Sequence, residues 1–220
     1  MSYVPAIDHH RKPLLRGWIH AATVPIAALG ALWLLLLVDE PSHRVAIGVF
    51  GTTLVGLYLI SALYHVPPWS ARARYIMSRF DVAMIPLFIA GTFTPVAFFA
   101  LSGGWRIWSL IVAWTVAVIA SGIAASPVRG PRWVSAVGYM AMGWLVVLPM
   151  TQLVTALPLE GLGLIALGGL LYTIGAVVYA RRRPDPAPRV LGFHEVFHLL
   201  VVAASITHYL AIWQYVLPAA

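Results

Sequence analysis

Seven long apolar runs constrain the fold of this 220-residue chain more than any other feature. A helix needs about 20 residues to cross the hydrocarbon core of a bilayer. With 61% hydrophobic and 10% charged residues, the composition is also far from that of a soluble domain. The runs predict an all-α, seven-transmembrane helix bundle that forms a single domain over residues 1–220. The expected spans lie near residues 17–38, 45–66, 82–101, 105–124, 133–152, 160–180 and 191–216.

The basic residues between the runs predict how the bundle is oriented. Counted by loop, 12 of the 14 lysines and arginines fall on the N-terminal side of the membrane, whereas Arg44 and Arg106 fall on the other side. The positive-inside rule therefore predicts a cytoplasmic N-terminus and an external C-terminus. The net charge of +7 is scattered through short loops without a continuous basic stripe, so nucleic-acid binding is not expected. The twelve residues are Arg11, Lys12, Arg16, Arg72, Arg74, Arg79, Arg129, Arg132, Arg181, Arg182, Arg183 and Arg189.

Ionisable residues at the ends of three runs predict a metal site. His194 and His198 lie one helical turn apart at the start of the seventh run, so their imidazoles point the same way. His65 ends the second run and Asp81 precedes the third, which places all four side chains at the cytoplasmic depth of the membrane. Because the chain has no cysteine, a metal must be held by nitrogen and oxygen ligands, which suit zinc. We therefore expect Zn²⁺ on His65, His194 and His198, with the fourth position open.

Two further side chains have both a functional and a structural interpretation. Ser61 lies one turn before His65 on the same helical face, where its hydroxyl could bond a carboxylate or a metal-bound water. Serines in transmembrane helices more often bond the carbonyl four residues earlier, and for Ser61 alone that interpretation is favoured. Asp81 could instead pair with Arg79 or cap its helix. Because unpaired ionisable groups are rare in spans, the set as a whole favours metal binding.

Residues 194–198 also match the pattern H-E-x-x-H. In metalloproteases with this pattern, two histidines bind zinc and the glutamate, here Glu195, is the general base. No motif for a third ligand follows the pattern in this chain, and the protease hypothesis leaves His65 and Asp81 unexplained. An intramembrane protease is therefore the less favoured hypothesis.

The other histidines are weaker candidates for ligands. His20 lies near the cytoplasmic end of the first run, and His208 lies about 21 Å beyond His194 at helical rise. Each is expected to pack against other helices or to support the ligands. A haem held by two of His20, His65, His194 and His208 is a further alternative, which a Soret band would reveal. The remaining three, His9, His10 and His43, are expected in solvated loops or at the terminus.

Ordered motifs run through most of the chain. They are Arg16-Gly17-Trp18-Ile19-His20, Ser61-Ala62-Leu63-Tyr64-His65, Arg79-Phe80-Asp81 leading to Ile89-Ala90-Gly91-Thr92-Phe93-Thr94-Pro95, Gly192-Phe193-His194-Glu195-Val196-Phe197-His198, and His208-Tyr209. In this order and spacing they resemble the bacterial hemolysin III proteins and their eukaryotic relatives, the progestin and adipoQ receptors. The resemblance implies a multi-pass protein of the plasma membrane, with the N-terminus inside and zinc near the cytoplasmic face.

The same resemblance implies roles for single residues. It makes His65, His194 and His198 the zinc ligands and Asp81 the residue that holds the zinc-bound water, and it matches Ser61 to the serine of the second-helix motif. The segment Phe80-Asp81-Val82 departs from the Asp-His of many relatives. Because that adjacent histidine is not a ligand, the site should survive the departure.

The family also implies an activity. Its wider superfamily includes alkaline ceramidases, so the resemblance implies a hydrolase of lipid amides or esters, with membrane lipids as partners and a lipid amide or fatty acid as ligand. Zinc would lower the pKa of its water toward ~7 and polarise the acyl carbonyl. Asp81 would act as general base, and Ser61 would help to stabilise the oxyanion. The alternative is a pore-forming hemolysin or a regulator of membrane homeostasis in which zinc is structural.

Overall fold

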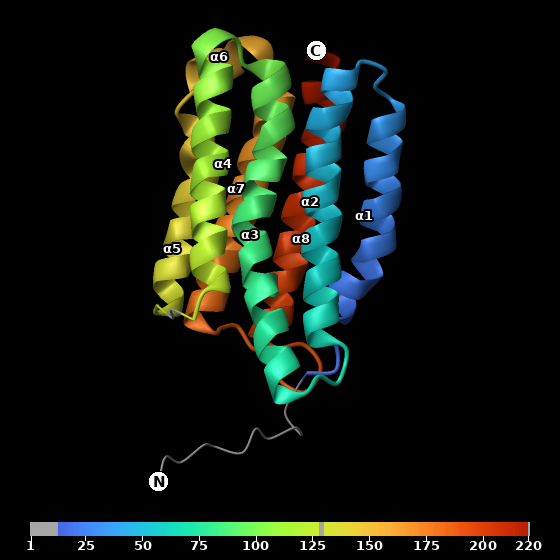
Figure 1. Cartoon of the computed structure of the whole chain (residues 1–220), viewed down its shortest axis with the longest axis vertical. Helices are drawn as coiled ribbons and strands as arrows, with labels where there is room; N and C mark the ends of the chain where they lie inside the picture. Colours follow the sequence, from blue (N-terminus) through green and yellow to red (C-terminus); the bar gives the residue numbers. More distant parts are fainter. Residues whose placement is uncertain (1–12, 128–129, 220) are drawn as a thin grey trace.

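The computed structural model of the chain describes residues 13–127 and 130–219, apart from the side chain of Arg132. These residues form a bundle of helices that run nearly parallel to its long axis (Figure 1). Within them there is no strand beyond one isolated bridge between Ala187 and Leu191. In chain order the helices are α1 (Trp18–Leu36), α2 (Pro41–His65), α3 (Ala71–Ala100), α4 (Gly103–Ala125), α5 (Arg132–Gly143), the 3₁₀ turn η2 (Trp144–Val147), α6 (Met150–Ala156), α7 (Leu159–Arg181), α8 (Phe193–Ala211), the π-helical turn η3 (Ile212–Val216) and the 3₁₀ turn η4 (Leu217–Ala219).

The helices account for the predicted membrane spans. Six are long and apolar enough to cross a bilayer, and the bent pair formed by α5 and α6 makes a seventh if the two count as one span. The all-α bundle predicted from the sequence is therefore confirmed. The fifth span, expected as one helix over 133–152, is instead broken by a 55° bend. Pro149 lies at the break, where it has no N–H to continue the helical hydrogen bonds.

Helix α3 begins eleven residues before the expected start of the third span at 82. Ser70 caps it, because its hydroxyl accepts a hydrogen bond from the Ala73 N–H at 3.3 Å. The first turns carry Arg72, Arg74 and Arg79, so they extend beyond the apolar segment. Asp81 consequently lies inside the helix, about three turns from its start. The interpretation of Asp81 as a helix cap is therefore wrong.

The two ends of the bundle differ in charge. The segment before α1 lies at the same end as the start of α8, where the Leu14 N–H donates to the Arg189 carbonyl at 3.0 Å. The chain finishes at the opposite end, beside the turn between α1 and α2 (Figure 1). The arginines at the first end, within the described residues, are Arg16, Arg72, Arg74, Arg79, Arg181, Arg182, Arg183 and Arg189. Arg44 and Arg106 lie at the other end, whereas Arg11, Lys12 and Arg129 are outside the described residues. The cytoplasmic placement of the first end stays a prediction.

The core of the bundle lies between α1, α2, α3 and α8. Its largest fully buried side chains include Phe50 and Tyr58 of α2, Leu34 of α1 and Ile212 after α8. Large apolar side chains such as Leu170 and Ile206 remain exposed on the outer surface, where a bilayer would cover them. Close packing of these helices fixes the end of α2 against the start of α8, which is where the ionisable residues meet.

Candidate metal centre

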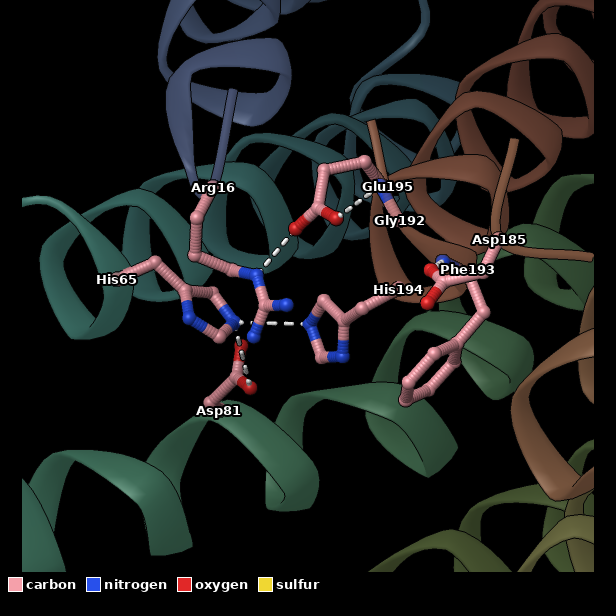
Figure 2. Close-up of polar contacts among 8 residues, drawn as sticks. All are labelled: Arg16, His65, Asp81, Asp185, Gly192, Phe193, His194 and Glu195. Atoms are coloured by element: carbon pink, nitrogen blue, oxygen red, sulfur yellow. Dashed lines mark hydrogen bonds and ion pairs between the residues drawn. The ribbon is translucent and has the colours of Figure 1, made fainter. Parts of the chain in front are cut away.

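Three histidines from two helices meet at the arginine-rich end of the bundle. One ring nitrogen from each of His65, His194 and His198 lies within 4.8 Å of the others. The Nε2 atoms of His65 and His194 are 3.2 Å apart (Figure 2). Because Zn–N bonds measure about 2.0–2.1 Å, nitrogens in a tetrahedral site are roughly 3.3–3.4 Å apart, so small side-chain rotations would let these three share one ion. The predicted convergence of the three histidines is confirmed, and their occupation by zinc stays a prediction.

Asp81 completes the cluster from α3. Its Oδ2 atom lies 3.9 Å from Nε2 of His65, and its side chain is only 19% exposed. Arg79, the alternative partner of Asp81, points away, since its terminal amino groups donate to the carbonyls of Ala124 and Pro127 at 3.4 Å. The structure therefore pairs Asp81 with His65 and not with Arg79.

Ser61 lies beneath this pair and is 2% exposed. It precedes His65 by one turn of α2, so both side chains face α3. Its hydroxyl lies within reach of the Asp81 carboxylate. The functional interpretation of the Ser61 hydroxyl stays a prediction.

Glu195 is fully buried and has a structural role. Its Oε2 atom accepts a hydrogen bond from the Gly192 N–H at 2.9 Å, which closes the capping box at the start of α8. Its other oxygen accepts a hydrogen bond from Nε of Arg16 (Figure 2). With both oxygens engaged, Glu195 is poorly placed to activate a water, and the structure disfavours the metalloprotease hypothesis for 194–198.

A cavity of about 210 Å³ opens beside the histidines. Arg16, Tyr64 and Tyr179 supply polar groups to its wall, and sequence analysis assigned none of the three to the site. Arg16 and Tyr64 entered only as members of the ordered motifs, Arg16 also as a marker of topology, and Tyr179 lies in an apolar run without a motif that sets it apart. The complete lining is Arg16, Tyr64, His65, Ser78, Asp81, Val82, Tyr179, Phe193 and His194.

His20 packs directly on the cluster. Its ring stacks on that of His198, with centroids 3.8 Å apart and planes 6° from parallel, and the residue is 3% exposed. This agrees with its expected role as a residue that supports the ligands.

The remaining histidines lie away from the cluster. His208 is half-buried, and its Nε2 contacts the Ile165 carbonyl of α7 at 3.1 Å, as expected of a packing residue. His43 belongs to the first turn of α2 and packs on Phe99 at 4.9 Å, so its expected place in a loop was wrong. His9 and His10 lie outside the described residues.

Gly17 lets the start of α1 approach the cluster. Its φ of 83° lies in the left-handed region, and a Cβ atom there would lie 2.5 Å from Cβ of His65. For Gly17→Ala, a left-handed backbone costs about 1–2 kcal/mol, so we expect the unfolding temperature to fall by about 2–8 °C. Displacement of His65 should also weaken metal binding, which a competing chromophoric chelator would measure. Gly163→Ala is the control, because open space surrounds that position. Equal unfolding temperatures and metal affinities in the two variants would contradict the prediction.

Comparison with known proteins places this arrangement in a family. The family model described as "Haemolysin-III related" matches residues 9–209. Hemolysin-3 of Bacillus cereus is 32% identical over 184 residues, which cover 81% of this chain and 78% of that protein. A hemolysin-3 homolog of Bacillus subtilis is 28% identical over 173 residues, or 78% and 77% of the two chains. The human monocyte to macrophage differentiation factor is 26% identical over 209 residues, or 90% and 82%.

The match to the family model, over residues 9–209, covers the segments that supply the histidine cluster and runs through nearly all the helices. The bacterial relatives suggest the plasma membrane as the location, in agreement with the apolar helices. The chain is thus a multi-pass integral membrane protein, and it belongs to the haemolysin-III family.

Proposed function

We propose that this protein is a zinc-dependent hydrolase of lipid amides or esters, with its site near the cytoplasmic face of the membrane. The observation that carries the proposal is the opening of a three-histidine cluster, with Asp81 beside it, onto a polar cavity. Structural zinc sites are closed by four protein ligands, whereas catalytic sites keep one position for water or substrate. The cavity wall includes His65, His194 and Asp81, so a small molecule in it would touch the cluster.

The donor set favours zinc over other common metals. Three imidazole nitrogens without thiolates or additional carboxylates suit a borderline ion, whereas calcium and magnesium prefer oxygen ligands. A zinc ion held there would supply a Lewis acid that polarises an acyl carbonyl and activates water for attack. The proposed function therefore needs His65, His194 and His198 in their neutral forms as ligands.

The residues of the chain would handle the proton. Asp81 is the proposed general base, which accepts a proton at its carboxylate and returns it to the leaving nitrogen or oxygen. Ser61 is proposed to orient that carboxylate, because its hydroxyl lies within reach of Asp81. This position suits an orienting role, whereas the sequence predicted stabilisation of the oxyanion. Burial of Ser61 and His198 keeps bulk water from that side of the cluster.

Metal content and hydrolysis, measured together on the purified protein, test the proposal. We expect about one zinc per chain and turnover of a lipid amide or ester that stops on chelation and returns when zinc is restored. Zinc without turnover, over a panel of both substrate classes, would instead favour a regulator or a pore with a structural ion. Absence of any bound metal would overturn the site assignment.

A further inference from the structure

Arg16 brings hydrogen-bond donors to the cavity that the described part of the chain leaves unused. Its Nε donates to the buried Glu195, and its side chain remains 22% exposed. The guanidinium reaches the space beside His65 and Asp81 (Figure 2). Among residues 13–127 and 130–219, the two terminal amino groups of Arg16 have no hydrogen-bond acceptor. The four N–H groups of this planar fork therefore face the cavity without a bond to the acceptors in its wall, such as Asp81.

The chemistry of that fork selects a class of ligand. A guanidinium presents paired donors that match the two oxygens of a carboxylate or a phosphate. Glu195 balances the charge of Arg16 but engages only its Nε, from the side away from the cavity. Because Arg16 and Glu195 cancel, the remaining charges would be those of a divalent ion on three neutral imidazoles and of an ionised Asp81. Their sum is +1. One negative charge on a ligand would neutralise it.

The size of the cavity limits what part of a lipid enters it. A volume of about 210 Å³ lies below the ~300–1,000 Å³ typical of pockets that bury a drug-sized ligand, so it suits a small polar head and is too small for a long acyl chain. Val82 and Phe193 supply the apolar part of the lining, where the first carbons of a chain could lie. The rest of the chain would extend along the apolar surfaces of the helices.

We propose that the cavity binds the head of an acyl lipid that carries an anionic oxygen group, and that Arg16 selects it. The inference rests on the proposed function, since it names the substrate class of the same site. N-acylglycine is the simplest substrate of this class. Water would add across its amide C–N bond, giving a fatty acid and glycine, with the proton of the water passing to the leaving nitrogen.

A matched pair of lipids tests the selectivity. N-palmitoylglycine and N-palmitoylethanolamine share the acyl amide and differ in whether a carboxylate or a hydroxymethyl group ends the head. For the wild-type protein we expect kcat/KM to be at least tenfold higher for the anionic lipid. The comparison uses the complete zinc-loaded protein in detergent, and each lipid serves as the internal control for the folding of every variant.

The variants distinguish the role of the terminal amino groups of Arg16 from the role of its ion pair with Glu195. Arg16→Gln alone would leave the buried Glu195 carboxylate without its cation and impair folding, so the test variant is Arg16→Gln/Glu195→Gln. Glu195→Gln is the control, because a glutamine can still accept from the Gly192 N–H and Arg16 remains. We expect the double variant to lose the tenfold preference and Glu195→Gln to keep it. Equal preference in the double variant and the wild type would overturn the role of Arg16.

Equilibrium binding of the two radiolabelled lipids to the same proteins separates this inference from the proposed function. Tighter binding of N-palmitoylglycine by at least tenfold, lost in the double variant, supports the inference even if neither lipid is hydrolysed. Palmitoyl lysophosphatidate should compete with it, whereas free glycine and inorganic phosphate should not, because they lack the chain. Equal binding of the two labelled lipids to wild-type protein would overturn the inference, whether or not both are hydrolysed.

Discussion

Replacing His194 with alanine is expected to strip the metal from the purified protein and to abolish chelator-sensitive hydrolysis. His194 supplies one of three nitrogens that lie within 4.8 Å of one another, and its Nε2 is 3.2 Å from that of His65. Loss of a residue that merely supports a ligand costs 10–100-fold in metal affinity. Loss of a direct ligand should therefore lower the metal affinity at least 100-fold. Metal per chain, measured by mass spectrometry after gel filtration, and affinity, measured by competition with a chelator, both report the loss.

His208→Ala is the matched control for this variant. Like His194, His208 is a half-buried histidine of α8, but it contacts the Ile165 carbonyl of α7 and lies outside the cluster. Its removal should lower stability and leave the metal content near that of the wild type. A His194→Ala protein that still holds about one zinc per chain would overturn the ligand assignment. Equal loss of metal in both variants would point to general unfolding, which the elution profile of the His208→Ala protein would reveal.

Replacing Asp81 with asparagine is expected to lower kcat while zinc remains bound. The substitution keeps the size of the side chain and a hydrogen-bonding partner for Ser61, but it removes the proton acceptor. General bases typically contribute 10²–10⁴-fold, so kcat should fall by about that factor. Asp81 lies 3.9 Å from Nε2 of His65 and outside the three-nitrogen set, so the metal content at saturating zinc should stay near one per chain.

The control for the charge change is Asp39→Asn. Asp39 lies at the opposite end of the bundle, fully exposed and 3.8 Å from Arg44, where a lost carboxylate should not affect catalysis. Undiminished turnover in Asp81→Asn would exclude Asp81 as the base. Loss of zinc from Asp81→Asn, at zinc concentrations that saturate the wild type, would make Asp81 a metal ligand and would contradict its assigned role.

The sequence predicted that His65, His194 and His198 meet, because hydropathy locates the spans and each span reverses the direction of the chain. Each span reverses the chain, so the number of spans between His65 and His194 decides whether they lie at the same end or at opposite ends. An even number of spans lies between them, which predicts that they lie at the same end. The Nε2 atoms of His65 and His194 are in fact 3.2 Å apart. The same rules could not place the start of α3, because hydropathy measures the fit to a bilayer and not the tendency to form a helix. Residues 71–80, with three arginines, are helical but not apolar.

Other parts of the site lay outside the reach of sequence patterns. Arg16 and Glu195 are 179 residues apart, and nothing in either local sequence indicates that they pair. The break between α5 and α6 also escaped prediction, since a proline within an apolar run is compatible with either a kinked helix or two helices. Contacts between distant residues depend on how whole helices rotate about their axes, and that rotation is set by packing throughout the core.

The three histidines are synthesised at different times, because one lies in α2 and two lie in α8, and this affects how the protein assembles. Two of the three histidines lie in α8, the last long helix. Arg16, which pairs with Glu195 of α8, lies before α1, the first helix. A ribosome therefore delivers His65 and Asp81 to the membrane well before it has made His194 and His198, the other two histidines of the cluster. Nascent chains that stop short of α8 would expose His65 and Asp81 and could not retain the ion with three nitrogens. Metal retention would thereby distinguish completed molecules from truncated ones during biogenesis.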